Sequence, residues 1–120
     1  MKIYLAHPRL IKEKGLQIQK CLEDEGIEVI NPFTTVEQGQ PMSAIVERER
    51  KIILEEVDAV VAIVDDVWTI GTTMEAGISW DHSIPVYVLW FSKQSEKSWY
   101  SYIATKIVYD LSSLLEILKR

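Results

Sequence analysis

The sequence predicts an α/β fold, a three-layer sandwich in which helices cover both faces of a five-stranded, mostly parallel sheet. Short apolar stretches alternate with segments whose apolar residues recur at helical spacing. The most apolar stretch, Ala59–Val64, lacks the alternation of a half-exposed strand, as is typical of strands buried in a parallel sheet. Helices between such strands imply right-handed crossovers and a flavodoxin- or Rossmann-like sheet with strand order 2-1-3-4-5.

The first strand is predicted at Lys2–Ala6. A helix follows, because Ile11, Ile18 and Leu22 share one helical face, and Gly26 lies where a helix would stop.

The second strand is predicted at Ile27–Ile30. The segment Asn31-Pro32-Phe33 ends it, because a proline has no N–H to donate to a strand ladder. Residues 34–41 are predicted as a loop, and Met42–Val57 as a helix with a charged outer face.

The third strand, Ala59–Val64, is expected at the centre of the sheet. Gly71 and Thr72 open a helix that runs to about Asp81, which places Glu75 in its first turn. The N–H groups of a first turn have no helical partners, and their partial positive charge favours an ionised carboxylate. Glu75 is therefore a candidate nucleophile, although stabilising the helix alone would also explain a glutamate there.

A fourth strand is predicted at Ile84–Trp90, a polar loop at residues 92–101 and a fifth strand at Thr105–Tyr109. The closing helix is marked by Leu111, Leu114, Leu115 and Leu118.

Composition predicts one domain spanning residues 1–120. The net charge of −5, without a basic block, disfavours binding of polymeric nucleic acid, and no apolar run has the length of a membrane span. Cys21 excludes an intrachain disulfide and is interpreted as core packing. No metal-ligand spacing is present, and the cytoplasm is the expected location.

Ligands of such sheets bind beyond the carboxyl ends of the strands. This rule selects His7 and Pro8, Asn31 and Phe33, Asp65 and Asp66, and the turn Gly71–Glu75. For Asp65 and Asp66, a solvated turn is the alternative interpretation.

In this order, these segments resemble the nucleoside 2-deoxyribosyltransferase family over nearly the whole chain. The matching segments are Lys2-Ile3-Tyr4-Leu5-Ala6-His7-Pro8, Asn31-Pro32-Phe33, Asp58–Ala62, Gly71-Thr72-x-x-Glu75-x-Gly77 and Pro85-Val86.

The resemblance implies that Glu75 attacks the anomeric carbon of a 2-deoxynucleoside, releases the base and forms a covalent glycosyl–enzyme intermediate. A second base or water then takes the sugar, as in retaining glycoside hydrolysis. Tyr4 would orient the carboxylate, although a core tyrosine fits the strand equally well. Phe33 and Trp68 are candidates to stack on the base. No cofactor is implied.

Two positions depart from the family pattern. Thr69 replaces an aspartate that grips the sugar hydroxyls, and Arg50 replaces an aspartate that helps to handle the leaving base. A guanidinium cannot perform the proton chemistry of a carboxylate, so Glu47 or Glu49 is the candidate substitute from a neighbouring turn.

Three functions remain open at this point. The first is transfer of a deoxyribosyl group between bases, and the second is hydrolysis of a nucleoside 5′-monophosphate. In the second case Thr69, Arg48 or Arg50, and the helix N-terminus would hold the phosphate. The third is a nucleotide-binding module without turnover.

The family also implies a homo-oligomer whose active sites are completed by a neighbouring subunit. The corresponding stretch here holds Trp99, Tyr100 and Tyr102 in a polar loop, which predicts at least a dimer with these aromatics near the interface.

Overall fold

The computed structural model describes residues 1–67, 69–95 and 98–120 and contains one sheet of parallel strands in the order β2-β1-β3-β4-β5. The strands are β1 (Lys2–Ala6), β2 (Glu28–Ile30), β3 (Ala59–Val64), β4 (Val86–Trp90) and β5 (Lys106–Val108). The predicted α/β fold and its strand order are confirmed.

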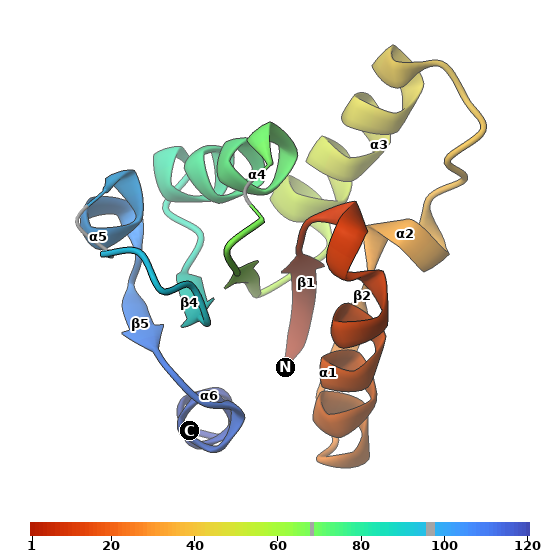
Figure 1. Cartoon of the computed structure of the whole chain (residues 1–120). Helices are drawn as coiled ribbons and strands as arrows, with labels where there is room; N and C mark the ends of the chain where they lie inside the picture. The colour runs from red at the N-terminus through yellow and green to blue at the C-terminus, as the bar shows by residue number, and fades with distance from the viewer. Residues whose placement is uncertain (68, 96–97) are drawn as a thin grey trace.

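The sheet is the middle of three layers. The helices are the 3₁₀ turn η1 (Arg9–Ile11), α1 (Lys12–Asp24), α2 (Pro32–Thr35), α3 (Met42–Glu55), α4 (Ile70–Asp81), α5 (Trp99–Ile103) and α6 (Leu111–Leu118). Helices α3, α4 and α5 cover one face, and α1 and α6 cover the other (Figure 1).

Alternation along β1 divides the apolar core between these layers. Tyr4 and Ala6 point toward α3 and α4, whereas Ile3 and Leu5 point toward α1. The side chain of Tyr4 is fully buried even though it carries a phenol. A buried hydroxyl needs a hydrogen-bond partner, so the Tyr4 phenol is expected to bond to a polar group on α3 or α4, the helices that it faces.

Two short helices lie where the sequence predicts loops. Pro32–Thr35 forms α2 because Asn31 accepts a hydrogen bond from the Phe33 N–H and a proline is favourable at the first helical position. Trp99–Ile103 forms α5, whose N-terminal cap is the Ser98 side chain. Neither helix is long enough to show a helical period in the sequence, so the loop predictions are wrong over residues 34–35 and 99–101.

Cys21 is exposed, which corrects its interpretation as a core residue. The buried stripe of α1 consists of Gly15, Ile18 and Leu22. Cys21 precedes Leu22 by one position, about 100° around the helix, and therefore lies on the flank of the stripe.

None of the helices in residues 1–67, 69–95 and 98–120 combines the length and the apolar character that a bilayer crossing requires.

Candidate functional site

A tyrosine and two glutamates from three different elements meet above the centre of the sheet. The Tyr4 hydroxyl of β1 donates a hydrogen bond to the Glu75 carboxylate of α4. Glu49 of α3 lies close enough to both groups for its charge to raise the pKa of each. The Glu75 carboxylate, which accepts a hydrogen bond from Tyr4, therefore lies beside the Glu49 carboxyl between the sheet and helices α3 and α4.

Glu75 lies in the second turn of α4, and its predicted place in the first turn is wrong. The helix begins at Ile70, before Gly71, because Thr69 is extended and its hydroxyl accepts a hydrogen bond from the Thr72 N–H. The electrostatic effect of a helix terminus fades within the first turn. The main influences on Glu75 are therefore burial, Tyr4 and Glu49.

Burial raises the pKa of Glu75 to about 8; the Tyr4 hydrogen bond opposes the rise, and the charge of Glu49 adds to it. Burial also raises the pKa of Glu49. The pKa of the Tyr4 phenol is raised by its own burial and by the charge of Glu75, so Tyr4 remains a donor. Two carboxyls held this closely share a proton at neutral pH.

Because the carboxyl pair holds a proton in the folded protein, we expect Glu75→Gln to change how stability depends on pH. The pKa of Glu75 is about 8 in the folded protein and 4.5 ordinarily. Between these values the folded protein holds a proton that the unfolded chain has released, so wild-type stability falls as pH rises through this window. The amide does not ionise. We expect the variant to melt at least about 10 °C above wild type at pH 8 and close to it at pH 5.

Thermal melts from pH 5 to 8 measure this difference, with Glu47→Gln as the control, because Glu47 is exposed on the same helix as Glu49. Wild-type and Glu75→Gln curves that run parallel across the range would contradict the shared proton.

A row of hydroxyls marks the start of α4. The Oγ1 atoms of Thr69 and Thr72 lie 3.1 Å apart, and Thr73 Oγ1 lies 3.0 Å from the hydroxyl of Tyr100 in α5. These four residues border a small hollow together with Pro8. The structure thus brings the predicted residues Pro8, Thr69 and Thr72 together, one to two turns from Glu75.

Three other predicted site residues form a separate cluster on turns that follow β1 and β2. His7 is buried against α1, with Nδ1 2.9 Å from the Pro8 carbonyl oxygen and Nε2 3.3 Å from Asn31 Oδ1. The rings of His7 and Phe33 have centroids 4.9 Å apart. The polar atoms of His7 and Asn31 thus make contacts that fix these turns.

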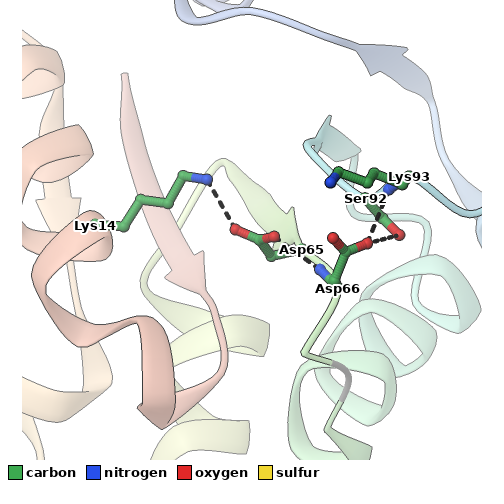
Figure 2. A network of polar contacts seen from close by, with 5 residues as sticks. All are labelled: Lys14, Asp65, Asp66, Ser92 and Lys93. Carbon is green, nitrogen blue, oxygen red and sulfur yellow. Dashed lines mark hydrogen bonds and ion pairs between the residues drawn. The ribbon is translucent and has the colours of Figure 1, made fainter.

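Asp65 and Asp66 are engaged in contacts within the protein (Figure 2). Asp65 pairs with Lys14 at 2.8 Å, and this hydrogen bond lowers the pKa of Asp65. Asp66 Oδ1 accepts from the Ser92 hydroxyl at 3.0 Å and from the Lys93 N–H at 2.8 Å. The two aspartates tie the loop after β3 to α1 and to the loop after β4.

The remaining predicted residues lie apart from the carboxyl pair or outside the described residues. Arg50 is exposed on α3 beside Glu47 and Lys51, and Arg48 pairs with Glu56 at 2.8 Å. Gly71 is exposed, with open space where a Cβ would lie. Trp68 lies outside the described residues.

Of the two candidate substitutes for the missing aspartate, Glu47 and Glu49, it is Glu49 that neighbours Tyr4 and Glu75. Glu49 follows Ile45 by four positions and precedes Ile53 by four, so it lies on the buried stripe of α3. A charged residue on an otherwise apolar helical stripe indicates a carboxylate turned toward the core, and this pattern is visible in the sequence. Gln38, in the segment between α2 and α3, donates through Nε2 to the carbonyl oxygens of Pro32 and Val36, and no sequence pattern indicates these contacts.

No protein-family model matches the sequence, and no curated protein does either. Solved structures with a similar fold exist. The chain is similar to the 2-deoxyribosyltransferase of Bacillus psychrosaccharolyticus, at 22% identity and a TM-score of 0.79, covering 96% of this chain and 90% of that one. It is also similar to a conserved protein of Enterococcus faecalis V583, at 20% identity and a TM-score of 0.73 over 99% and 97% of the two chains. A third likeness is to the CMP N-glycosidase of Clostridium botulinum, at 17% identity and a TM-score of 0.67 over 99% and 98%. The chain shares its fold with these proteins.

Proposed function

We propose that this protein is a nucleoside 2-deoxyribosyltransferase-like enzyme, which cleaves the N-glycosidic bond of a deoxynucleoside and transfers the sugar to another base. The single observation that carries the proposal is the Glu75 carboxylate, held by the Tyr4 hydroxyl and flanked by Glu49. Its support is twofold: the motif around Glu75 resembles that of the transferases, and the fold is shared with a 2-deoxyribosyltransferase and with a CMP N-glycosidase.

In the first step, a Glu75 oxygen attacks the anomeric carbon and forms an ester bond to the sugar. The carbon–nitrogen bond breaks, its electron pair leaves with the base, and the base takes the shared proton from Glu49. The Tyr4 hydroxyl donates to Glu75 and favours the ionised nucleophile. Burial of the pair strengthens the charge stabilisation of the oxocarbenium-like transition state.

In the second step, the acceptor base gives a proton to Glu49 while its nitrogen attacks the anomeric carbon. The ester bond breaks, and its electron pair returns to the Glu75 carboxylate. Atoms and protons balance over the two steps, and the pair again holds one proton. A carboxylate nucleophile and a carboxyl acid suffice for this chemistry, so the proposal requires no cofactor.

The second candidate is hydrolysis of a nucleoside 5′-monophosphate through the same glycosyl intermediate, with water as the acceptor. The fold shared with the CMP N-glycosidase favours it, as do the threonine hydroxyls at the start of α4. Arg48 and Arg50, the predicted phosphate ligands, lie on the exposed side of α3. For a monophosphate substrate, the threonine hydroxyls and the backbone N–H groups at the start of α4 would therefore bind the phosphate.

A chromatographic assay tests the proposal with deoxynucleosides and their 5′-monophosphates, each with and without an acceptor base. Formation of a new nucleoside only when acceptor is present supports transfer. Base release from monophosphates without acceptor supports the hydrolase. Thermal stabilisation by these compounds without base release would instead support the third possibility, a binding module.

We further propose that the protein forms a homodimer or a larger homo-oligomer through the outer side of α4 and α5. Ile70, Met74, Trp99 and Tyr102 are exposed, with Trp99 75% and Tyr102 82% accessible. Tyr100 is buried beneath them, which corrects its placement in an exposed loop. An outer surface this apolar is typical of a helix pair that another subunit covers.

Trp99→Glu is expected to convert the oligomer to a monomer, because it places a charge in the apolar surface. Light scattering at micromolar concentration measures this, with Tyr109→Glu as the control, because Tyr109 is exposed beyond β5, away from α4 and α5. A wild-type monomer, or the same mass for wild type and Trp99→Glu, would contradict the interface.

A further inference from the structure

The face of α3 that carries Glu49 is closed on one side of this residue and open on the other. Val46 and Met42 precede Glu49 by three and seven positions, so they share its face of the helix. Ile52 and Ile53 follow Glu49 and are fully buried. Val46, by contrast, is 47% exposed and Met42 71%. In Figure 1 the first turns of α3 extend past the neighbouring helices. Glu49 therefore lies where a covered stretch of the helix gives way to an apolar stretch open to solvent.

Helix α4 is open at the corresponding place. Both helices lead into strands of one parallel sheet, so both begin at the edge where the strands end. Gly71 precedes Glu75 by four positions and lies on the same face of α4, one turn nearer this edge. It is exposed, with open space where a Cβ would lie. Val46 and Gly71 are therefore on the side of the carboxyl pair that is nearer this edge.

The carboxyl pair is accessible from the same side. Long side chains of a helix lean toward its N-terminus and cover the turn that precedes their own Cα. Glu49 and Glu75 therefore lean toward the starts of α3 and α4, and both residues are only partly buried. A substrate that approaches over the starts of these two helices meets both carboxyls.

The proposed proton transfer restricts where the leaving base lies. A general acid acts on an atom within hydrogen-bond reach, so a nitrogen of the base must lie beside Glu49. Ile52 and Ile53 fill the space on one side of Glu49, so the ring extends to the other side, over Val46. Met42 lies about 10 Å before Glu49 along the helix axis, at the far end of this apolar stretch.

We infer that Val46 packs against the base of the substrate and that Met42 extends this contact to the second ring of a purine. The inference rests on the proposed function for the position of the base, and it adds the side chains that select the base. Apolar side chains suit the face of a planar ring, while the neighbouring carboxyls hold its polar edge.

Methyl NMR tests the contact without turnover, in Glu75→Gln, which cannot form the sugar ester. Added 2′-deoxyadenosine should shift the methyl signals of Val46 and Met42, because a ring packed on them changes their magnetic environment. Added 2′-deoxycytidine, with one ring, should shift those of Val46 alone. The Leu16 methyls are the control, because Leu16 is 38% exposed on α1, which covers the opposite face of the sheet.

Val46→Ala is expected to raise the half-saturating concentration of both deoxynucleosides about tenfold, with the maximal rate within about twofold, because the contact is present before and during bond cleavage. Met42→Ala should do so for 2′-deoxyadenosine alone. Base release under single-turnover conditions without acceptor measures both quantities. Leu16→Ala, the matched control, should leave them unchanged.

Gly71→Leu separates occlusion from loss of structure. Leucine is the better helix former and meets open space at this position, so the variant should melt at or above the wild-type temperature. Its side chain fills the approach to Glu75, so the half-saturating concentration should rise at least about tenfold. Gly77→Leu is the control in the same helix, because open space also lies where a Cβ of Gly77 would be and Gly77 is on another face of α4.

Unshifted Val46 methyls on addition of either nucleoside would overturn the inference, as would equal kinetics in Val46→Ala and Leu16→Ala. A smaller mass for Met42→Ala than for wild type by light scattering would also overturn it, because a second copy would then cover the stretch. Shifted Val46 methyls in a protein whose wild type releases no base would count against the proposed function alone.

Discussion

Glu75→Gln is expected to lower the rate of base release by at least about four orders of magnitude, the scale of losing a catalytic nucleophile. The amide keeps the shape of the side chain and still accepts the Tyr4 hydrogen bond, but it cannot form the sugar ester. Chromatography of released base under single-turnover conditions measures the loss. Ligand-induced thermal shifts of the variant then show whether it still binds substrate.

Glu47→Gln provides the control for this change, because it removes an exposed carboxylate from α3. It should leave the rate within about twofold of wild type, as surface substitutions away from a site usually do. A rate in Glu75→Gln within about tenfold of wild type would contradict the assignment of the nucleophile.

Glu49→Gln is expected to lower turnover of natural deoxynucleosides by about 10²- to 10³-fold, the typical contribution of a general acid. The effect should depend on the leaving group. A 2-deoxyriboside with a nitrophenolate leaving group needs no proton, so its cleavage should be nearly as fast in the variant as in wild type.

This difference between leaving groups distinguishes proton donation from a structural role. An equal loss with both substrates would contradict the role of Glu49 as the acid and would make it only a support for Glu75. The alkaline decline of the wild-type rate should disappear in Glu49→Gln, because that decline reports the proton that the pair shares.

The sheet could be predicted from the sequence because its core strands carry a strong and local signal. Ala59–Val64 is buried along its whole length, and its predicted limits are those of β3. The order of the strands is the flavodoxin-like one that five strands alternating with helices suggest. The short helices α2 and α5 were missed, because five residues or fewer show no period and only their caps, Asn31 and Ser98, indicate them.

Residues of the candidate site could be predicted from the sequence only where they belong to a recognisable motif or lie on a predicted strand. Tyr4 and Glu75 fall in such segments, and the structure joins them by a hydrogen bond. The polar partners of Asp65 and Asp66 could not be predicted, because Lys14 lies 51 positions before Asp65 and the pairing depends on the fold. The exposure of Arg50 was also hard to predict. Arg50 directly follows Glu49 on α3, and one position along a helix is enough to turn its side chain outward while that of Glu49 is half-buried.

Intact-protein mass spectrometry of the wild type, after rapid mixing with a deoxynucleoside in the absence of acceptor, tests directly whether Glu75 forms a covalent bond to the sugar. We expect an added mass equal to one deoxyribosyl group, found by peptide mapping on Glu75 and absent from Glu75→Gln. Base release without any such adduct, or an adduct on another residue, would contradict a covalent mechanism through Glu75.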